Sequence, residues 1–159
     1  MGALRRQYVE WTTEALAAVR AELGENCLGV AVYGSVARGT PHEGSDIDLL
    51  VVARTLPPGR GPRAAVAQTV EDAFHSQVGV NAPDLSLLLR TAEELEIGFP
   101  LLLEIWADGQ VLDDPTGALS SALAAFQRRI ERRGAQRKRS GDFWHWDLQG
   151  DSRPGEWEL

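Results

Sequence analysis

The sequence predicts an α/β (α+β) protein built on a small mixed sheet of about four strands with flanking helices. Two observations predict this class. Short apolar runs with the length of buried strands recur along the 159 residues, and segments with apolar residues at helical spacing separate them. Such alternation is typical of folds in which helices pack on a central sheet. We expect the helices to pack on one side of that sheet.

The first half of the chain contains two expected helices and two expected strands. In chain order, the pattern predicts a helix over residues 3–23, strands over 27–33 and 46–53, and a helix over 64–77. Gly24 is a plausible end for the first helix. The segment 34–44 between the strands contains several glycines and a proline, so it is too broken for a long element.

The second half continues the alternation. The pattern predicts a strand over residues 84–90, a short helix from Thr91, a helix from Pro100 to about Trp106, a short final strand over 110–112 and a helix over 117–139. Thr91-Ala92-Glu93-Glu94 has the form of a capping box, and Pro100 suits a first helical turn. We expect residues 1–140 to form one domain, with 141–159 as an aromatic tail packed on it.

Composition excludes several classes of protein. The single cysteine, Cys27, rules out an internal disulfide and a cysteine-based zinc cluster, and its apolar surroundings predict a buried thiol. No apolar run reaches the ~18 residues that a membrane span needs. We therefore expect a cytoplasmic protein without a membrane partner. The net charge of −7 makes non-specific binding to nucleic acid unfavourable.

Asp46 and Asp48 open the second predicted strand. Side chains two residues apart on a strand point to the same face, so the two carboxylates project side by side. Their mutual repulsion is relieved by a bound cation, and oxygen ligands select a hard ion such as Mg²⁺. The alternative is that both acids merely begin a strand at its solvent-exposed edge.

Gly34 and Ser35 end the first predicted strand and lead towards Asp46. A glycine there lets the backbone approach a phosphate closely, and Ser35 adds a hydroxyl donor. A tight turn would explain the same pair. Asp84 opens the third predicted strand, so three carboxylates converge if that strand neighbours the second, enough for two metal ions. Asp84 is equally explained as an acid at a strand start.

The composite segment GSVARGTPHEGSDIDLLV resembles the signature of the DNA polymerase beta-like nucleotidyltransferase superfamily. It is most similar to the minimal nucleotidyltransferase family of single-domain members. The matching positions are Gly34, Ser35, Ala37, Arg38, Gly39, Ser45, Asp46 and Asp48. Asp84 resembles the third carboxylate of the family by its place on the following strand. The specific part of the resemblance covers roughly residues 30–53, and it implies the DNA polymerase beta-like nucleotidyltransferase fold for the domain over 1–140.

The resemblance implies roles for individual residues. Asp46, Asp48 and Asp84 would be the catalytic, metal-binding carboxylates, with Asp84 as base or orienter for the acceptor hydroxyl. The nucleotide would be bound by Gly34, Ser35, Arg38 and Ser45. Arg38 would either touch a phosphate or brace the loop by a local ion pair, and bracing is favoured.

The implied reaction is transfer of a nucleoside monophosphate, AMP from ATP, to a hydroxyl, with two Mg²⁺ ions and release of pyrophosphate. The acceptor is a small molecule or a partner protein, and members of toxin–antitoxin pairs work with a helical HEPN-type partner. The alternative function is a catalytically weak module that binds a nucleotide or a partner, as an antitoxin does.

Two C-terminal features remain open. Residues 128–139 carry seven basic residues and one acid, and are either a solvated helix or a docking surface for RNA or an acidic partner. A nucleic-acid partner is the less favoured reading. Trp144, Trp146 and Trp157 are expected to close a core, although aromatic side chains of this kind can also stack a base. His145 is expected to be structural.

Overall fold

A computed structural model of the chain describes residues 2–141 and 143–147. Within these residues the helices are α1 (Ala3–Leu23), a 3-10 turn (Gly24–Asn26), α2 (Gly34–Ala37), α3 (Arg60–Val78), α4 (Ala92–Ile97), α5 (Pro100–Asp108) and α6 (Ala118–Arg132). The strands are β1 (Cys27–Tyr33), β2 (Ile47–Ala53), β3 (Leu85–Thr91), β4 (Gln110–Asp113), β5 (Gln136–Ser140) and β6 (Phe143–Asp147). None of the described helices combines the length and apolar character needed to cross a membrane.

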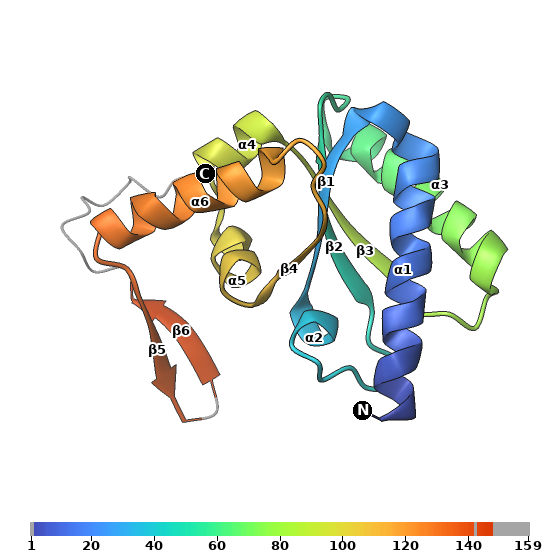
Figure 1. Ribbon diagram of the computed structural model, residues 1–159, viewed down its shortest axis with the longest axis horizontal. Coiled ribbons are helices and arrows are strands. Elements are labelled where there is room, and N and C mark those ends of the chain that lie inside the picture. Colours follow the sequence, from blue (N-terminus) through green and yellow to red (C-terminus); the bar gives the residue numbers. More distant parts are fainter. Residues whose placement is uncertain (1, 142, 148–159) are drawn as a thin grey trace.

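The central sheet is mixed and contains four strands in the order β3-β2-β1-β4 (Figure 1). β1 runs antiparallel to both β2 and β4, whereas β2 and β3 run parallel. The parallel pair is joined through α3, as a crossover between parallel strands requires. The predicted class and the predicted strand number are therefore confirmed.

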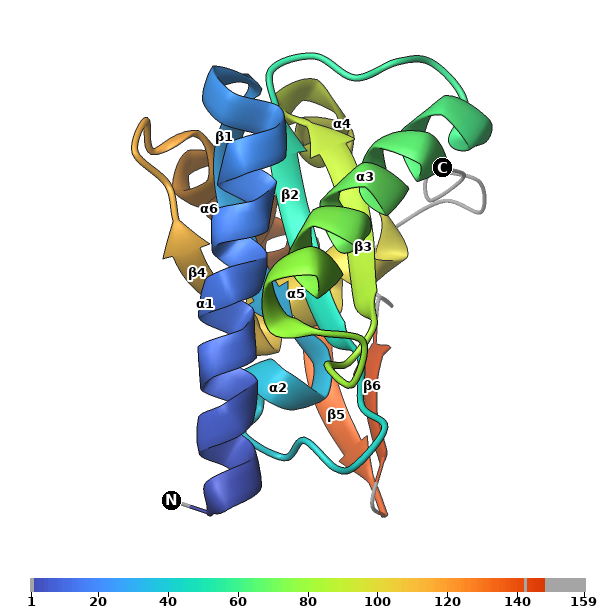
Figure 2. The ribbon, with the colours of Figure 1, turned by 90° about the vertical axis from the view of Figure 1, so that its right-hand side faces the viewer.

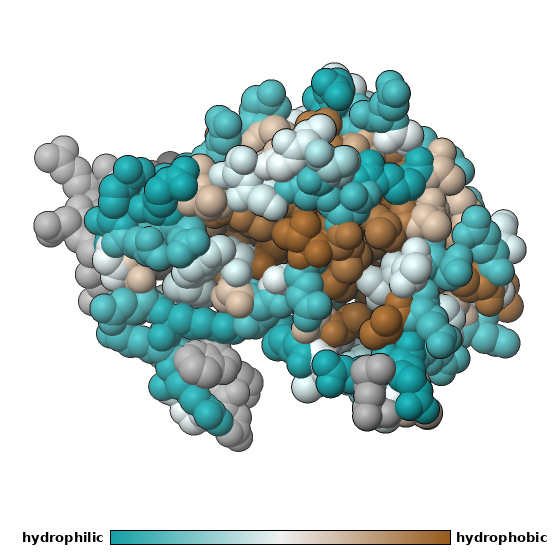
Figure 3. Space-filling view, in the orientation of Figure 1, coloured by the Kyte–Doolittle hydropathy of each residue, from teal (hydrophilic) through white to brown (hydrophobic). Residues whose placement is uncertain are grey.

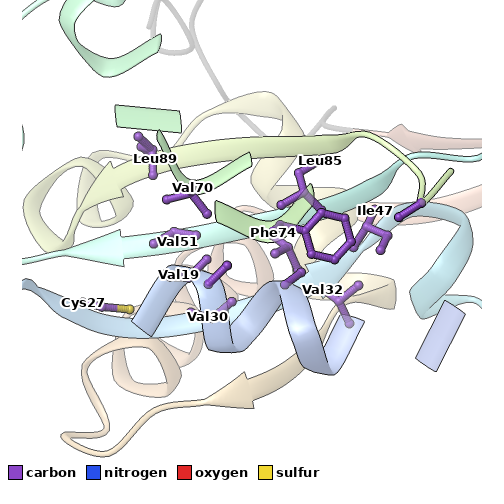
Figure 4. Close-up of a cluster of buried hydrophobic side chains, with 14 of the residues drawn as sticks. Val19, Cys27, Val30, Val32, Ile47, Val51, Val70, Phe74, Leu85 and Leu89 are labelled. Atoms are coloured by element: carbon purple, nitrogen blue, oxygen red, sulfur yellow. The ribbon is translucent and has the colours of Figure 1, made fainter. Parts of the chain in front are cut away.

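Helices cover both faces of this sheet, so the expectation of one covered face is wrong. On one face, α1 and α3 pack through Val19, Val70 and Phe74 against alternate residues of the strands. Figure 4 shows Phe74 among Ile47, Leu85 and other buried side chains. The strands are almost continuously apolar, which is the pattern of a sheet buried on both faces rather than one.

The opposite face of the sheet is covered by α4, α5 and α6. Leu50 and Val52 of β2 point to this side and pack with Leu102 of α5 and Phe126 of α6. The two helix starts predicted near Thr91 and Pro100 are confirmed, and the Thr91–Glu94 capping box forms both of its hydrogen bonds. The chain passes from α5 through β4 into α6, and these helices lie behind the sheet in Figure 2, with α1 and α3 in front.

The predicted helix over 117–139 is half right. α6 ends at Arg132, and after Gly134, whose φ is +70°, the chain forms the antiparallel hairpin β5–β6. Arg137 binds Asp108 at 2.8 Å through each of two nitrogens, and Lys138 pairs with Asp147. The basic residues reach these acids because the segment is extended, a tertiary effect that helical spacing does not reveal. Hydrophilic side chains cover this arm in Figure 3, whereas hydrophobic ones gather across the middle of the same view.

The tail expected to pack on the domain is described only as far as Asp147. Trp146 donates to Glu104 Oε1 at 3.2 Å, and its ring centroid lies 5.5 Å from that of Trp106 on α5. This contact agrees with a packing role for Trp146. His145 is exposed in β6. Trp157 lies outside the described residues, as does the side chain of Trp144.

Candidate active site

The register of the sheet places Asp48 at the centre of the candidate site. Asp48 lies opposite Tyr33, the last residue of β1, and beside Ser86 on β3. Asp46 is exposed and directly precedes β2. The two aspartates therefore stand at the end of β2 that meets the β1–α2 turn.

Gly34 and Asp48 are in close contact. Gly34 has a φ of +68°, which favours glycine, and a methyl group added to it would overlap Asp48 Oδ2. The glycine is thus required twice, by its backbone conformation and by the carboxylate against it. This contact brings the predicted phosphate-binding turn and a predicted metal ligand to one place.

The environment of Asp48 disfavours its charge. Burial raises the pKa of the Asp48 carboxyl, and the negative charge of Asp46 acts in the same direction. A hydrogen bond with the Ser86 hydroxyl and the charge of Arg38 oppose the rise without reversing it. A half-buried carboxylate held in this state is a typical cation ligand, since a bound cation stabilises the ionised form.

Arg38 forms a local ion pair. Its Nη1 lies 3.8 Å from Asp108 Oδ2, and about half of its side chain is exposed. Asp108 also receives the two hydrogen bonds from Arg137 of β5, so one carboxylate joins the α2 loop to the hairpin. The ion pair agrees with the bracing role for Arg38, and its contact with a nucleotide stays a prediction.

Ser45 is buried and holds its own loop. Its hydroxyl oxygen accepts from the His42 N–H at 3.0 Å. Tyr8 of α1 donates to the Ser45 carbonyl at 2.7 Å and lies 3.1 Å from the His42 carbonyl. The helical spacing of residues 3–23 gives no sign that the Tyr8 hydroxyl fixes the loop before Asp46.

Asp84 directly precedes β3 and is strongly exposed, with 81% of its side chain accessible. Its carbonyl accepts from the Ile47 N–H at 3.0 Å, so its backbone lies beside the Asp46–Asp48 segment. Its carboxylate is 3.9 Å from His75 Nε2. Ligand atoms of Glu71, His75 and Asp84 lie within 4.8 Å of one another, a second grouping with the composition of a metal site.

Two residues of the site were missed from the sequence. Ser86 and Tyr33 interact through their hydroxyls, and Ser86 also bonds to Asp48. Ser86 is two residues after Asp84, so strand alternation would have placed it on the same face. Among the described residues, the side chain paired with Asp48 on β3 is thus a serine rather than a third acid.

A sequence profile of the Nucleotidyltransferase domain family matches residues 14–110, more than half of the chain. The chain therefore belongs to this family. The match begins within α1 and ends at the start of β4, so it includes the turn at Gly34, the aspartates 46, 48 and 84, and the strands β2 and β3.

A curated relative is similar to the chain over part of its length. The chain is 37% identical over 68 residues to a Methanocaldococcus jannaschii protein, MJ1305, named as a candidate protein adenylyltransferase. This match covers 43% of the chain and 46% of that relative, so the chain spans about half the length of the curated relative it matches.

Two solved structures share the fold. A chain from the crystal structure of a toxin–antitoxin with AMP-PNP has a TM-score of 0.50 at 15% identity, covering 77% of this chain and 91% of that chain. Spectinomycin adenyltransferase AAD(9) from Enterococcus faecialis, solved with ATP and spectinomycin, has a TM-score of 0.52 at 13% identity. That match covers 78% of this chain and 66% of that chain, and at such identities both likenesses establish the fold alone.

Proposed function

We propose that this protein is a Mg²⁺-dependent nucleotidyltransferase that transfers AMP from ATP to a hydroxyl group of an acceptor. The observation that carries the proposal is the contact between the Gly34 turn and the Asp48 carboxylate. It joins a backbone turn open to a phosphate with an oxygen ligand for the cation that accompanies that phosphate. The M. jannaschii relative, named for adenylyl transfer to protein, supports the choice of AMP.

The residues on the donor side bind and orient the nucleotide. Gly34 admits the phosphates close to the backbone, and the Ser35 hydroxyl donates to a phosphate oxygen. Ser45 fixes the loop that carries Asp46, since its side chain and its carbonyl are both bonded. Arg38 is half exposed beside Asp108, and its charge acts on Asp48, so it would also offset phosphate charge at this site.

The carboxylates fit a hard divalent cation. Asp46 and Asp48 offer adjacent oxygen ligands at the start of β2, and the desolvated Asp48 is stabilised as an anion by such an ion. Asp84 begins the neighbouring strand and completes the proposed set for two ions. When bound, Mg²⁺ neutralises charge on the attacking and leaving oxygens of the displacement.

The reaction is a displacement at the α-phosphorus. A new bond forms from the acceptor oxygen to this phosphorus, the bond to the bridging α–β oxygen breaks, and pyrophosphate leaves with the electron pair of that bond. Asp84 accepts or orients the proton of the acceptor hydroxyl. In the cytoplasm, a helical HEPN-type protein is our proposed acceptor, and a small molecule is the other acceptor class.

The test combines binding and turnover. We expect isothermal titration to show ATP binding with Mg²⁺, and we expect α-labelled ATP to give labelled adduct and pyrophosphate when a hydroxyl acceptor such as tyrosinamide is supplied. Asp48→Ala should abolish pyrophosphate release. Full turnover by this variant would contradict the role given to the carboxylates. Asp72→Asn, an exposed change on α3, is the control.

One observation favours a second candidate function. The β3 residue paired with Asp48 is Ser86, and Asp84 is 81% exposed beside His75. A catalytically weak module that binds a nucleotide or a partner, like an antitoxin, would need no third carboxylate next to Asp48. Such a module would release no pyrophosphate with any acceptor, and in the titration it would bind ATP or, as a partner-binding module, not bind it at all. The enzyme would bind ATP and release pyrophosphate.

A further inference from the structure

A pocket of about 420 Å³ opens beside the candidate active site, on the side of α1. One wall is the first half of α1, and the other is formed by the loop before β2 and the loop before β3. Figure 1 and Figure 2 show the loop after α2 passing beside the N-terminal end of α1 on its way to β2. Asp46 and Asp84 both line this pocket, so it opens onto two of the proposed catalytic carboxylates.

The charges of the pocket have a single sign. Three carboxylates line it, those of Glu43, Asp46 and Asp84, and none of the described residues that line it is a lysine, an arginine or a histidine. Carboxylates repel a triphosphate, and His75, which lies 3.9 Å from Asp84, does not itself line the pocket. Metal ions would compensate Asp46 and Asp84 in part. Glu43 lies outside the proposed metal set, so those ions would not compensate its charge and it can pair with a cationic ligand.

The pocket lies beside the proposed nucleotide cradle and shares only part of it. Of the proposed nucleotide-binding residues, Ser45 lines the pocket, whereas Gly34, Ser35 and Arg38 do not, and neither does Asp48. The nucleotide would therefore approach Asp48 from the turn, and the α1 pocket remains for the second substrate. An attacking hydroxyl must come within reach of the same carboxylates, which is the position that this pocket offers.

The remaining lining residues suit an organic cation. Trp11 presents a partly buried indole, and its ring meets that of Tyr8 edge-on at a centroid distance of 5.2 Å. An indole beside carboxylates is a typical environment for an ammonium or guanidinium group. Gln7 and Asn81 add exposed amides that can accept from its N–H groups.

We infer that this pocket binds the acceptor, and that the acceptor carries an ammonium or guanidinium group close to the hydroxyl that is modified. The inference rests on the proposed function, because it assigns the acceptor half of that reaction. Cation recognition at Trp11 and Glu43 places the neighbouring hydroxyl at Asp46 and Asp84. The same chemistry is found in a basic segment of a protein and in a small amino alcohol.

The test compares acceptors that differ only in charge. With Mg²⁺ and ATP, pyrophosphate release is measured for N-acetyl-arginyl-tyrosinamide and for N-acetyl-citrullyl-tyrosinamide, which has nearly the same shape without the guanidinium charge. We expect kcat/KM to be about tenfold higher for the arginyl compound, the size of a partly desolvated cation–π and ion-pair contact. A parallel comparison of glucosamine with glucose shows whether a small amino alcohol is also accepted.

Substitutions in the pocket test whether it causes the preference for the charged acceptor. Glu43→Gln changes an exposed loop residue and should reduce the preference for the charged acceptor to about threefold or less, and Trp11→Leu should reduce it similarly. Glu10→Gln, an exposed acid of α1 that does not line the pocket, should leave it unchanged. Equal kcat/KM for the two peptides, or a preference that survives Glu43→Gln, would overturn the inference.

Failure of the proposed function can be recognised separately. If neither peptide supports pyrophosphate release, titration with ATP and Mg²⁺ tests the donor site, and direct titration of the two peptides tests the pocket without turnover. Weaker binding of the citrullyl peptide by about tenfold, lost in Glu43→Gln, would still support the pocket. Equal dissociation constants for the two peptides would reject it.

Discussion

Asp48 and Asp108 are partly buried aspartates with opposite surroundings. Asp48 stands at the end of β2 against the Gly34 turn, with Asp46 beside it, and its pKa is raised chiefly by burial. Asp108 ends α5, where hydrogen bonds from Arg137 hold the pKa of its carboxyl below the ordinary value. The positive charge of Arg38 acts to lower the pKa of both carboxyls, weakly in each case.

The comparison separates a binding carboxylate from a structural one. The charge on Asp108 is compensated within the fold, so it stabilises the junction between α5 and the β5–β6 hairpin. The charge on Asp48 is left largely uncompensated, which is unfavourable for the protein alone and favourable once a cation binds. Substitution at the two sites should therefore have opposite effects on activity and stability.

The largest expected effect is that of Asp48→Asn. Removing the charge should lower nucleotidyl transfer by about 10³-fold, because a cation loses a ligand at the reacting phosphate. Without Mg²⁺, the variant should unfold at the same temperature as the wild type or higher at pH 7, because the buried carboxylate is no longer charged. Pyrophosphate release and calorimetry measure the two effects, and a strongly destabilised variant would contradict the comparison.

Gly34→Ala should weaken ATP binding by about 10²-fold, since its methyl group overlaps the Asp48 carboxylate and displaces it. Gly117→Ala is the matched control. Gly117 also has a positive φ, of +72°, but a methyl group added to it meets nothing within 4 Å. Both variants should lose about 1 kcal/mol of stability from the positive φ. Titration with Mg²⁺ and ATP should show a defect in Gly34→Ala alone, and equal defects would show that the contact is unimportant.

Asp84→Asn tests a carboxylate that is neither half-buried, as Asp48 is, nor bonded to an arginine, as Asp108 is. If Asp84 orients the acceptor hydroxyl, transfer should fall by about 10²-fold with ATP affinity nearly unchanged. Kinetics at saturating ATP, with titration calorimetry for the affinity, separate these quantities. Wild-type turnover in Asp84→Asn would remove Asp84 from the catalytic set and leave Asp46 and Asp48 as the proposed catalytic carboxylates.

Asp108→Asn should affect stability first. Loss of the charge-assisted bonds to Arg137 should cost about 1–3 kcal/mol in the free energy of unfolding. Transfer should be retained within about threefold, since Asp108 supports the site only through the half-exposed Arg38. Urea denaturation measures the loss, and Asp72→Asn serves as the exposed control. Unchanged stability would show that the pair with Arg137 contributes nothing.

The smallest expected effect is the pH dependence of the stability difference between the wild type and Asp108→Asn. The pKa of Asp108 is lower in the folded protein than in the unfolded chain, so its ionised form stabilises the fold above the ordinary aspartate value, about pH 4. This contribution is lost as the pH falls through the lower, folded value. The stability gap between the wild type and Asp108→Asn should therefore close below about pH 4, and a gap that widens with acid would contradict the assignment.

Several elements could be predicted because their signals are local. The apolar run at 27–33 matched β1 to the residue, and the capping box at Thr91 and the proline at 100 marked the starts of α4 and α5. The hairpin was missed since nothing within 133–147 shows that Arg137 has a carboxylate on α5 to bind. The second covered face was also missed, although the unbroken apolar character of β1 and β2 indicated it.

The sequence by itself determined the donor half of the candidate site. Strand periodicity puts Asp46 and Asp48 on one face, and the Gly34-Ser35 turn precedes them in an unbroken segment, because both depend on neighbours along the chain. Only the tertiary structure decided that Asp48 touches Gly34, that Ser86 pairs with Asp48, and that α1 closes a pocket over Asp46. These contacts join residues that are not neighbours along the chain. Strand register and helix packing determine them, and the local sequence pattern does not.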